Sequence, residues 1–553
     1  TLLRNAQKTL PLDSTKPLRL LVLAVSGDSD AYPALDFERE IRPRADALTF
    51  IRTDTKFEPA SGIQLPSPDS YDAAIAAIFV RVADRKGSVG LPDDQVALVE
   101  KLLAGKKTTV VACFGSPYII ERFPKAQTWL AAFSTMDVAQ IGAVRAMFGE
   151  VAMGGELPVS IPDAKPPLKI GAGIKIAANP MTLAAIDSAE SAKLSRAYAL
   201  LDGGVADGAF PGGVIAVGHN GTFASHAFGR LTYDTKSAKV MADTVYDAAS
   251  LTKPVVTTTL AAQFVEAGRM QLDAPISVLL PEWLTAAKDK SSAQIDWRKR
   301  VTLRNLLTHT SGLPGHVDYF ANSKSEHDIV ERAITEPLMY EPGTKSEYSD
   351  LDFMLLGEMI ERLTGRTLDS LAAEKIFAPI GMRDTSFNPS AKMKSRIAPT
   401  ENDTAFRKEQ VRGEVHDENA WAMGGVAGHA GLFTTAGDLA AFAQMMLNGG
   451  IYAHHRVLRR STVEDFTEAQ AVSAKARTLG WMAPTENSSS GRYFSAESFG
   501  HTGFTGTSLW IDPKKDLFVA LLTNRVYPTR ENDKLAKLRP AIHDAVVEGL
   551  GLK

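Results

Sequence analysis

The sequence predicts two domains of different class. We expect an α/β layer domain over residues 1–162, a linker over 163–181, and an α+β domain over 182–553 with an antiparallel sheet and a helical lobe. In the first part, apolar strand-like runs alternate with helix-like segments, which is typical of a parallel sheet. The stretch before the second part holds three prolines and two glycines with little periodicity. In the second part, strand patterns stand at both ends with helices between them.

The α/β prediction depends on short runs that are apolar almost throughout. They occupy 18–26, 71–80 and 108–114 and are rich in Val, Ile, Leu and Ala, as suits strands covered on both faces. The segment 92–104 begins with proline and two aspartates and then carries apolar residues at helical spacing. A further strand and helix are expected over 126–148. Together these segments predict a layered parallel sheet.

The second domain begins with an expected helix over 183–203. Two glycine-rich strand patterns follow, joined at Asn220-Gly221, a dipeptide that favours a tight hairpin turn. Helical and loop patterns fill 250–470, and strand patterns return over 499–524. We therefore expect the two ends of this domain to meet in one antiparallel sheet.

Composition excludes several function classes. Of 553 residues, 44% are hydrophobic and 23% are charged, a composition that rules out a disordered chain. The chain has 61 basic and 64 acidic residues, so its formal charge is −3, which gives no reason to bind nucleic acid. The single cysteine, Cys113, excludes an intrachain disulfide and a multi-cysteine metal site, and its apolar surroundings predict an inert thiol. No apolar run approaches the roughly 18 residues that span a bilayer.

The strongest chemical motif is Ser250-Leu251-Thr252-Lys253, an S-x-x-K sequence followed by Pro254. Proline is tolerated near the first turn of a helix, so a helix is expected to start at the serine, with the lysine one turn away on the same face. The positive helix end would favour an oxyanion, and a partly buried lysine could accept the serine proton. The alternative is an ordinary solvated helix. The nucleophile elbow G-x-S-x-G is absent.

Two further motifs lie downstream, Tyr348-Ser349-Asp350 and His501-Thr502-Gly503. With them, residues from about 183 to 550 resemble the β-lactamase and penicillin-binding-protein superfamily of serine hydrolases, and most of all class C β-lactamases, family VIII esterases and D-aminopeptidases. Four further stretches carry the same resemblance: 301–314, 341–365, 376–387 and 424–442.

The resemblance implies catalytic roles for three residues. Ser250 would be the acylated nucleophile and Lys253 its hydrogen-bonded base partner. Tyr348 would share the acid and base work, with its phenol pKa lowered by the lysine. His309, in the stretch LLTHTSG, is expected to fix a loop.

The resemblance also implies substrate contacts by Asp350 and by the strand His501-Thr502-Gly503. The backbone N–H groups of Ser250 and Phe504 would form the oxyanion hole, in which about 3 kcal/mol is typically lost per donor removed.

Two positions depart from the lactamase pattern. His501 replaces a lysine, and a histidine is mostly neutral at pH 7 and a poorer anchor for a carboxylate. Asp350 replaces an asparagine, so a hydrogen-bond donor to the substrate becomes an acceptor. Both changes favour an esterase, amidase or D-amino-acid peptidase over a lactamase. His416, Asp417, Glu418 and His429 suggest metal ligands, but their spacing fits no zinc pattern. Loop structure or substrate contact is the expected role of this segment, and we expect neither metal nor cofactor.

The first domain resembles a different family. The stretches 1–12, 92–120 and 155–162 are similar to the C-terminal α/β domain of family 3 glycoside hydrolases. In that family a catalytic barrel precedes this domain and supplies the nucleophile. Because the chain begins at Thr1, we expect it to be the C-terminal part of a bacterial fusion of a β-N-acetylhexosaminidase with a β-lactamase-like hydrolase.

The first hypothesis for function is therefore a serine hydrolase that acts through an acyl-enzyme on an ester or amide, with peptidoglycan peptides as the expected substrates. The alternative is a fragment of a β-N-acetylhexosaminidase whose barrel is absent, with the hydrolase-like domain serving as a binding module. A silent peptidoglycan-binding protein is the third hypothesis, which the complete Ser-Lys-Tyr set disfavours. The expected partner is a small-molecule or peptide substrate from the cell wall, in a periplasmic or cell-envelope location.

Overall fold

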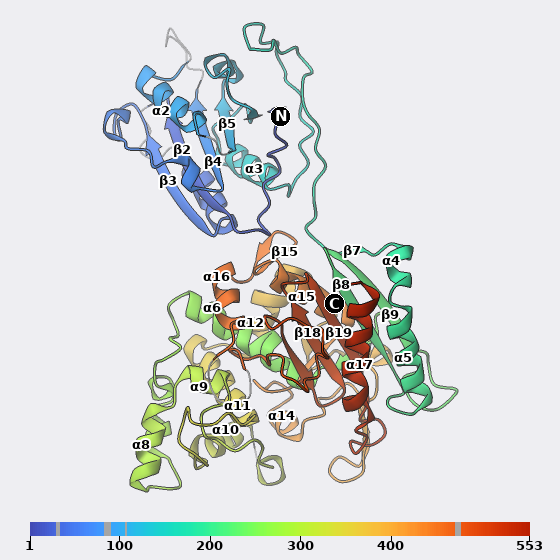
Figure 1. The fold of residues 1–553 in the computed structure, drawn as a ribbon. Coiled ribbons are helices and arrows are strands. Elements are labelled where there is room, and N and C mark those ends of the chain that lie inside the picture. The colour runs from blue at the N-terminus through green and yellow to red at the C-terminus, as the bar shows by residue number, and fades with distance from the viewer. Residues whose placement is uncertain (29–33, 82–89, 106–107, 324, 471–476) are drawn as a thin grey trace. The chain divides into compact units, whose positions relative to one another are not determined.

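The computed structural model describes the chain except for residues 29–33, 82–89, 106–107, 324 and 471–476. It consists of two compact units, Thr1–Met181 and Thr182–Lys553 (Figure 1). Each unit has its own sheet and its own apolar core. Among the described residues, no helix combines the length and the apolar content needed to cross a membrane.

The first unit is built on a six-stranded sheet in the order β1-β6-β5-β4-β2-β3. Neighbouring strands are parallel except for the first, which pairs antiparallel with β6 at the edge. The predicted α/β class is confirmed. The strands are β1 (Leu2–Asn5), β2 (Arg19–Ser26), β3 (Ala47–Thr53), β4 (Ala73–Val80), β5 (Thr109–Gly115) and β6 (Thr128–Ala131).

Helices cover both faces of this sheet, as its continuously apolar strands require. On one face lies α2 (Asp93–Leu103), whose buried side chains join one apolar cluster, and on the other lie α1 (Leu35–Ile41) and α3 (Asp137–Met147), whose buried side chains join a second. Cys113 lies buried within β5, and burial raises the pKa of its thiol to about 12. The expectation of an unreactive thiol agrees with this environment.

The proline- and glycine-rich stretch 163–181, expected to be a linker, packs onto the first unit along much of its length. Leu168 forms a backbone bridge with Ile161, Ile174 with Leu2, and Ile176 with Met153. These bridges attach the segment to the first unit, while most of its side chains, apart from the buried Ala164, remain exposed.

The second unit is built on a six-stranded sheet in the order β17-β18-β19-β8-β9-β7. The junction of its two halves is the antiparallel pair β19 and β8, in which Leu517 faces His219. This confirms the prediction that the ends of the domain meet in one sheet. The strands are β7 (Ala184–Ala185), β8 (Gly212–His219), β9 (Thr222–Gly229), β17 (Phe499–Gly503), β18 (Thr507–Asp512) and β19 (Leu517–Thr523).

The hairpin between β8 and β9 turns at Asn220 and Gly221. Both residues have positive φ, 50° and 73°, as a two-residue type I′ turn requires. The predicted tight turn is present, and it sets the register in which His219 faces Thr222.

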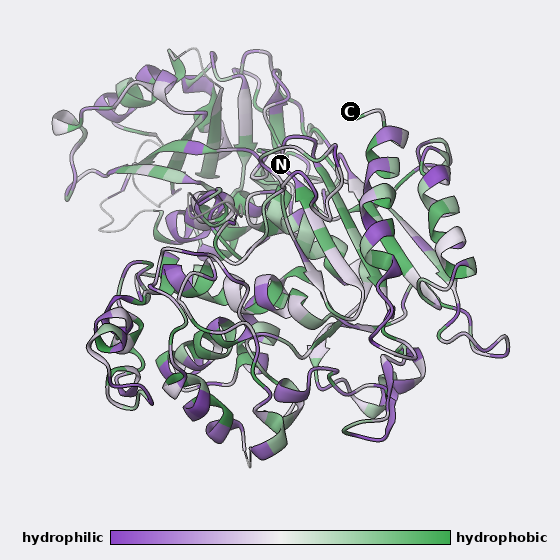
Figure 2. Ribbon diagram, turned by 60° about the horizontal axis from the view of Figure 1, so that its bottom comes forward, coloured by the Kyte–Doolittle hydropathy of each residue, from purple (hydrophilic) through white to green (hydrophobic). Residues whose placement is uncertain are grey.

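Helices also cover both faces of the second sheet. The helices α5 (Ser195–Ala206) and α17 (Lys534–Gly549) share an apolar cluster with one face, and α15 (Ala436–Leu447) packs against the other. Figure 2 shows the hydrophobic residues gathered where these helices meet the strands.

The remaining elements form the helical lobe and three small sheets. The helices are α4 (Ser188–Ala192), α6 (Thr259–Glu266), α7 (Glu282–Thr285), α8 (Ser292–Arg300), α9 (Leu303–Leu307), α10 (Glu326–Thr335), α11 (Asp350–Thr364), α12 (Leu368–Ala372), α13 (Ala378–Ile380), α14 (Glu418–Ala422) and α16 (Arg460–Thr467). The short strands are β10 (Tyr246–Asp247), β11 (Ser386–Phe387), β12 (Glu401–Asp403), β13 (Glu409–Val411), β14 (Leu432–Thr434), β15 (Ile451–Tyr452) and β16 (His455–Arg456).

Candidate active site

Ser250 lies in one turn of 3₁₀ helix, Ala249–Leu251, that leads into the helical segment ending in α6. Ala249 has a φ of +48°, a left-handed conformation that is costly for a residue with a Cβ atom. The Asp247 carboxylate accepts its N–H at 2.8 Å and helps to hold it there. The serine is thus presented on a strained turn, a common feature of functional sites.

The three residues expected to be catalytic are brought together. Lys253 lies one turn after Ser250, and its Nζ donates to the serine Oγ at 3.0 Å. Tyr348, although 98 residues away in sequence, donates from its hydroxyl to the same Oγ at 2.8 Å. The lysine Nζ also lies 4.8 Å from the centroid of the tyrosine ring.

Local hydrogen bonds explain why Tyr348 reaches the serine. It lies just before α11, where Ser349 caps the helix by accepting the N–H of Asp352. The buried His309 accepts the N–H of Ser349 at its Nδ1, 3.1 Å away, and its ring lies 4.7 Å from that of Tyr348. His309 therefore fixes this loop, as expected from the sequence.

Lys253 is fully buried, with no exposed side-chain surface, and makes three hydrogen bonds. Besides Ser250, its acceptors are Asp350 Oδ1 at 2.7 Å and the carbonyl of His429 at 3.1 Å. An ammonium has three donors, so each has a partner. Burial alone would lower the pKa of this amine, but the adjacent Asp350 and Tyr348 outweigh it and the pKa is raised. In the resting site Lys253 is therefore an ammonium ion.

Tyr348 differs from expectation in its acidity. Burial is the largest influence and raises the pKa of the phenol, the Lys253 charge opposes it, and the Asp350 carboxylate raises it again. Lys253 lowers the pKa of the phenol as expected, but the net pKa is above its ordinary value, so the expectation of a more acidic tyrosine is wrong for the resting site. The main reason is the burial of the phenol, and the negative charge of Asp350 adds to it. The pKa of Asp350 itself is lowered, since the Lys253 charge and the His316 hydrogen bond outweigh burial.

The strand β17 runs past the serine turn and carries His501, Thr502 and Gly503. A Cβ atom added to Gly503 would lie 2.5 Å from the carbonyl oxygen of Ala248, so only glycine permits this close approach. The sequence therefore needs a glycine here for packing against the nucleophile turn.

His501 is buried, and its Nδ1 donates to the Thr502 carbonyl at 2.8 Å. Its Nε2 has no hydrogen-bond partner within the described part of the chain. Burial, with the Lys253 and Arg477 charges, lowers its pKa to about 3. His501 is therefore neutral and gives no charge to hold a substrate carboxylate.

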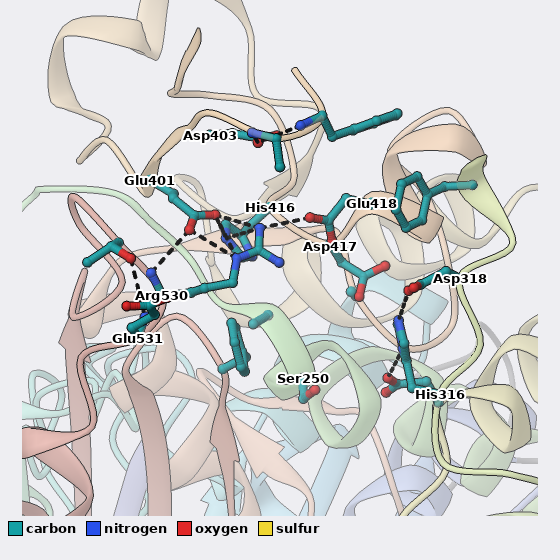
Figure 3. Close-up of a pocket in the computed structure, with 18 of the residues that line it drawn as sticks. Ser250, His316, Asp318, Glu401, Asp403, His416, Asp417, Glu418, Arg530 and Glu531 are labelled. Atoms are coloured by element: carbon teal, nitrogen blue, oxygen red, sulfur yellow. Dashed lines mark hydrogen bonds and ion pairs between the residues drawn. The ribbon is translucent and has the colours of Figure 1, made fainter. Parts of the chain in front are cut away.

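A cavity of about 960 Å³ opens over Ser250 (Figure 3). Tyr348, Asp350 and the half-exposed side chain of Phe504 line it with the serine. The orientation of the Ser250 and Phe504 N–H groups as an oxyanion hole stays a prediction. The other ionisable side chains of the lining are mostly acidic: Asp318, Glu401, Asp403, Asp417, Glu418, Glu531, Arg530, His316 and His416.

Arg530 is the one lysine or arginine in the described lining, and acidic neighbours hold it. It donates to Glu401 at 2.6 Å and to Glu418 at 2.8 Å, and His416 lies 2.7 Å from Glu401. Burial would raise the pKa of Glu401, but His416 and Arg530 outweigh it and lower the pKa to about 2. The cavity therefore keeps an excess of negative charge.

Sequence reasoning missed two features near the serine. Arg477 is buried with its Cζ 5.6 Å from the Tyr348 ring centroid, so a second cation flanks the tyrosine. His316 lies 3.2 Å from Asp350, through Nδ1 and Oδ2. Neither residue belongs to a recognisable motif, and only folding brings them to the site.

Comparison with known proteins agrees with this geometry. Residues 198–543 match the Beta-lactamase family, and residues 1–193 match the Glycosyl hydrolase family 3 C-terminal domain. An "N-acetylmuramyl-L-alanine amidase" of Bacillus subtilis (strain 168) is 32% identical over 363 residues, 60% of this chain and 81% of the relative. A "Putative D-alanyl-D-alanine carboxypeptidase" of Escherichia coli (strain K12) is 34% identical over 310 residues, 52% of this chain and 70% of the relative.

Solved structures support the fold of the second unit. EstCE1, described as a hydrolase with promiscuous acyltransferase activity, is similar with a TM-score of 0.53 at 20% identity, over 65% of this chain and 100% of that one. A penicillin-binding protein homologue from Caulobacter crescentus is similar with a TM-score of 0.52 at 19% sequence identity, and the match covers 66% of this chain and 99% of that one. The chain belongs to the β-lactamase family of serine hydrolases, and a glycosyl hydrolase family 3 C-terminal domain precedes the hydrolase domain in the same chain.

Proposed function

We propose that this hydrolase cleaves the amide between N-acetylmuramic acid and the first alanine of a peptidoglycan peptide. The observation that carries the proposal is the 32% identity to an amidase of that name over four-fifths of its length. The family 3 glycosidase domain in the same chain supports it, because it associates the hydrolase with sugar chemistry. A role in the cell envelope follows from such a substrate.

The reaction would proceed through an acyl-enzyme on Ser250. The serine Oγ attacks the amide carbonyl, the C–N bond breaks, and the peptide leaves with its amine protonated. Water then hydrolyses the ester and returns the proton to the serine. Lys253 and Tyr348 both contact Oγ, so they are the groups that carry the proton.

The resting protonation state sets a condition on this step. An ammonium and a neutral phenol cannot take the serine proton, so the active form holds one proton fewer, shared by Lys253 and Tyr348 as a coupled pair. The pKa values of both groups are raised, and deprotonation of the pair therefore limits activity as the pH falls. Asp350, which contributes to both shifts, is the residue that controls this equilibrium.

A second candidate is a D-alanyl-D-alanine carboxypeptidase, because a relative of that name is 34% identical. Such a substrate ends in a carboxylate. The neutral His501 and the acidic cavity are poorly suited to bind it, and for this reason we rank the amidase first.

The experiment is to incubate the protein with N-acetylmuramyl-L-alanine amide, which has no free carboxylate, and with a peptide ending in D-Ala-D-Ala, and to identify the products by mass spectrometry. We expect free N-acetylmuramic acid from the first and no D-alanine from the second. The Ser250→Ala variant should be inactive, and Ser225→Ala, which changes an exposed serine of β9, should match the parent. Release of D-alanine alone would favour the second candidate.

A fluorophosphonate probe tests the nucleophile independently of substrate. Peptide mapping should find the adduct on Ser250, and an unlabelled native protein would contradict an acyl-enzyme mechanism. Nitrophenyl N-acetylglucosaminide should be left intact by this chain, and its turnover would contradict the expectation that the catalytic barrel of the glycosidase alternative is absent.

A further inference from the structure

We propose that His316, Asp350 and Asp417 form a binding site for a divalent transition-metal ion, with Zn²⁺ as the best-suited ion, in the wall of the active-site cavity. Each of the three residues offers one ligand atom, and these atoms all lie within 4.8 Å of one another. All three residues line the cavity over Ser250. These three residues do not belong to a recognisable metal-binding motif of the sequence.

Two of the three ligand atoms, from His316 and Asp350, have the spacing that a small ion requires, and the Asp417 oxygen lies within 4.8 Å of both. Zinc bonds of about 2.0–2.1 Å at a tetrahedral angle place ligand atoms about 3.3 Å apart. His316 Nδ1 and Asp350 Oδ2 are 3.2 Å apart. An ion could therefore bind between them without a large movement of either side chain.

Each ligand side chain is held by a further partner outside the trio, as is usual around metal ions. His316 Nε2 lies 3.2 Å from Asp318 Oδ1, so an ion bound at Nδ1 would replace only the contact of that nitrogen with Asp350. Asp350 Oδ1 accepts from Lys253 at 2.7 Å.

Asp417 is anchored on two sides. Its Oδ1 accepts the N–H of Ala420 at 2.8 Å, which caps α14, and lies 3.0 Å from His429 Nε2. Its carboxylate is therefore fixed in direction.

The ligands come from three separate parts of the fold. His316 lies in the loop after α9, Asp350 is the first residue of α11, and Asp417 caps α14. Figure 3 shows His316 and Asp417 on the same side of the cavity, near Ser250. With ligands so far apart in sequence, only the tertiary fold can assemble the site.

The donor set selects the class of ion. One imidazole and two carboxylates suit zinc and similar borderline ions, whereas calcium prefers six to eight oxygen ligands and copper(I) prefers sulfur. Three protein ligands leave a fourth position, which would face the cavity, as in open zinc sites. The competing explanation is an ion-pair network that binds no metal, and the experiment must separate the two.

The test is calorimetric titration of the EDTA-treated, dialysed 553-residue chain with zinc chloride. We expect one saturable component that His316→Gln weakens by about tenfold or more, in line with the effect of losing metal-site residues. Asp417→Asn should weaken the same component while its side-chain oxygen can still cap α14. Glu531→Gln, which removes a cavity carboxylate outside the trio, should bind zinc as the parent does.

Cobalt(II) supplies a second measurement. A tetrahedral nitrogen–oxygen site should give visible absorption that His316→Gln abolishes. The proposal is overturned if the parent shows no such component, or if both ligand variants bind zinc as the parent does. Titration of Ser250→Ala keeps the result separate from the proposed function, because metal binding does not require catalysis.

Discussion

Asp350 and Lys253 form a buried ion pair next to Ser250, with Asp350 Oδ1 and Lys253 Nζ 2.7 Å apart. The lysine also donates to Ser250, so two hydrogen bonds through Lys253 connect the carboxylate to the serine Oγ. Removing one partner of a buried pair changes the charge state of the other. This pair therefore decides the protonation state in which the enzyme rests.

Asp350→Asn should shift the pH dependence of the hydrolase. Loss of the carboxylate lowers the pKa of Lys253 and of Tyr348, so the form lacking one proton persists to lower pH. The acidic limb of kcat/KM should move to lower pH, and activity near pH 7 should rise. The pH profile of kcat/KM is measured with EDTA present. Asp318→Asn, which changes an exposed carboxylate of the same cavity, should leave the limb in place, and a shift to higher pH for Asp350→Asn would contradict the argument.

Tyr348→Phe should reduce kcat by about 10²- to 10⁴-fold, the usual contribution of a positioned acid or base. The hydroxyl contacts Ser250, while the ring packs on His309 and would remain. The thermal midpoint should therefore change little. Tyr233→Phe removes an exposed hydroxyl that bonds only a loop carbonyl, and it serves as the matched control. A near-normal rate for Tyr348→Phe would exclude the tyrosine from proton transfer.

His501→Lys should raise the affinity for penicillins. The substitution brings a cation to the strand that lines the site, where the parent has a neutral imidazole with a pKa of about 3. Labelled penicillin measures the rate of Ser250 acylation. The new charge lies near Lys253 and Arg477, so a lower thermal midpoint is expected as well. Weaker or unchanged acylation would mean that position 501 does not face the substrate carboxylate.

Glu401→Gln should destabilise the second unit at neutral pH but not in acid. The pKa of Glu401 is about 2 in the folded chain, below the ordinary value of about 4.3, so it stabilises the fold above pH 4.3 and this contribution is lost as the pH falls toward 2. The difference in thermal midpoint between parent and variant should shrink over that range. Glu486→Gln, at an exposed position, should show no such trend. A constant difference would mean that the ion pairs with Arg530 and His416 do not contribute.

Much of the site follows from local sequence and resemblance. The S-x-x-K spacing places Lys253 one helical turn from Ser250, because residues three apart share a helix face. The placement of Tyr348 needed the resemblance, since nothing local indicates that residue 348 meets residue 250. The acidic cavity wall could not be predicted, because Asp318, Glu401 and Glu531 come from unrelated segments.

The sequence by itself determined the two fold classes, the sheet that closes the second unit and the position of Lys253 one turn from Ser250, because apolar periodicity and short motifs act over a few residues. Only the tertiary structure decided the charge states. A pKa depends on burial and on charges within a few ångströms, and the partners here are distant in sequence: Asp350 for Lys253, Arg477 for His501, and Arg530 for Glu401. For that reason the phenol of Tyr348, expected to be more acidic, is less so in the folded protein.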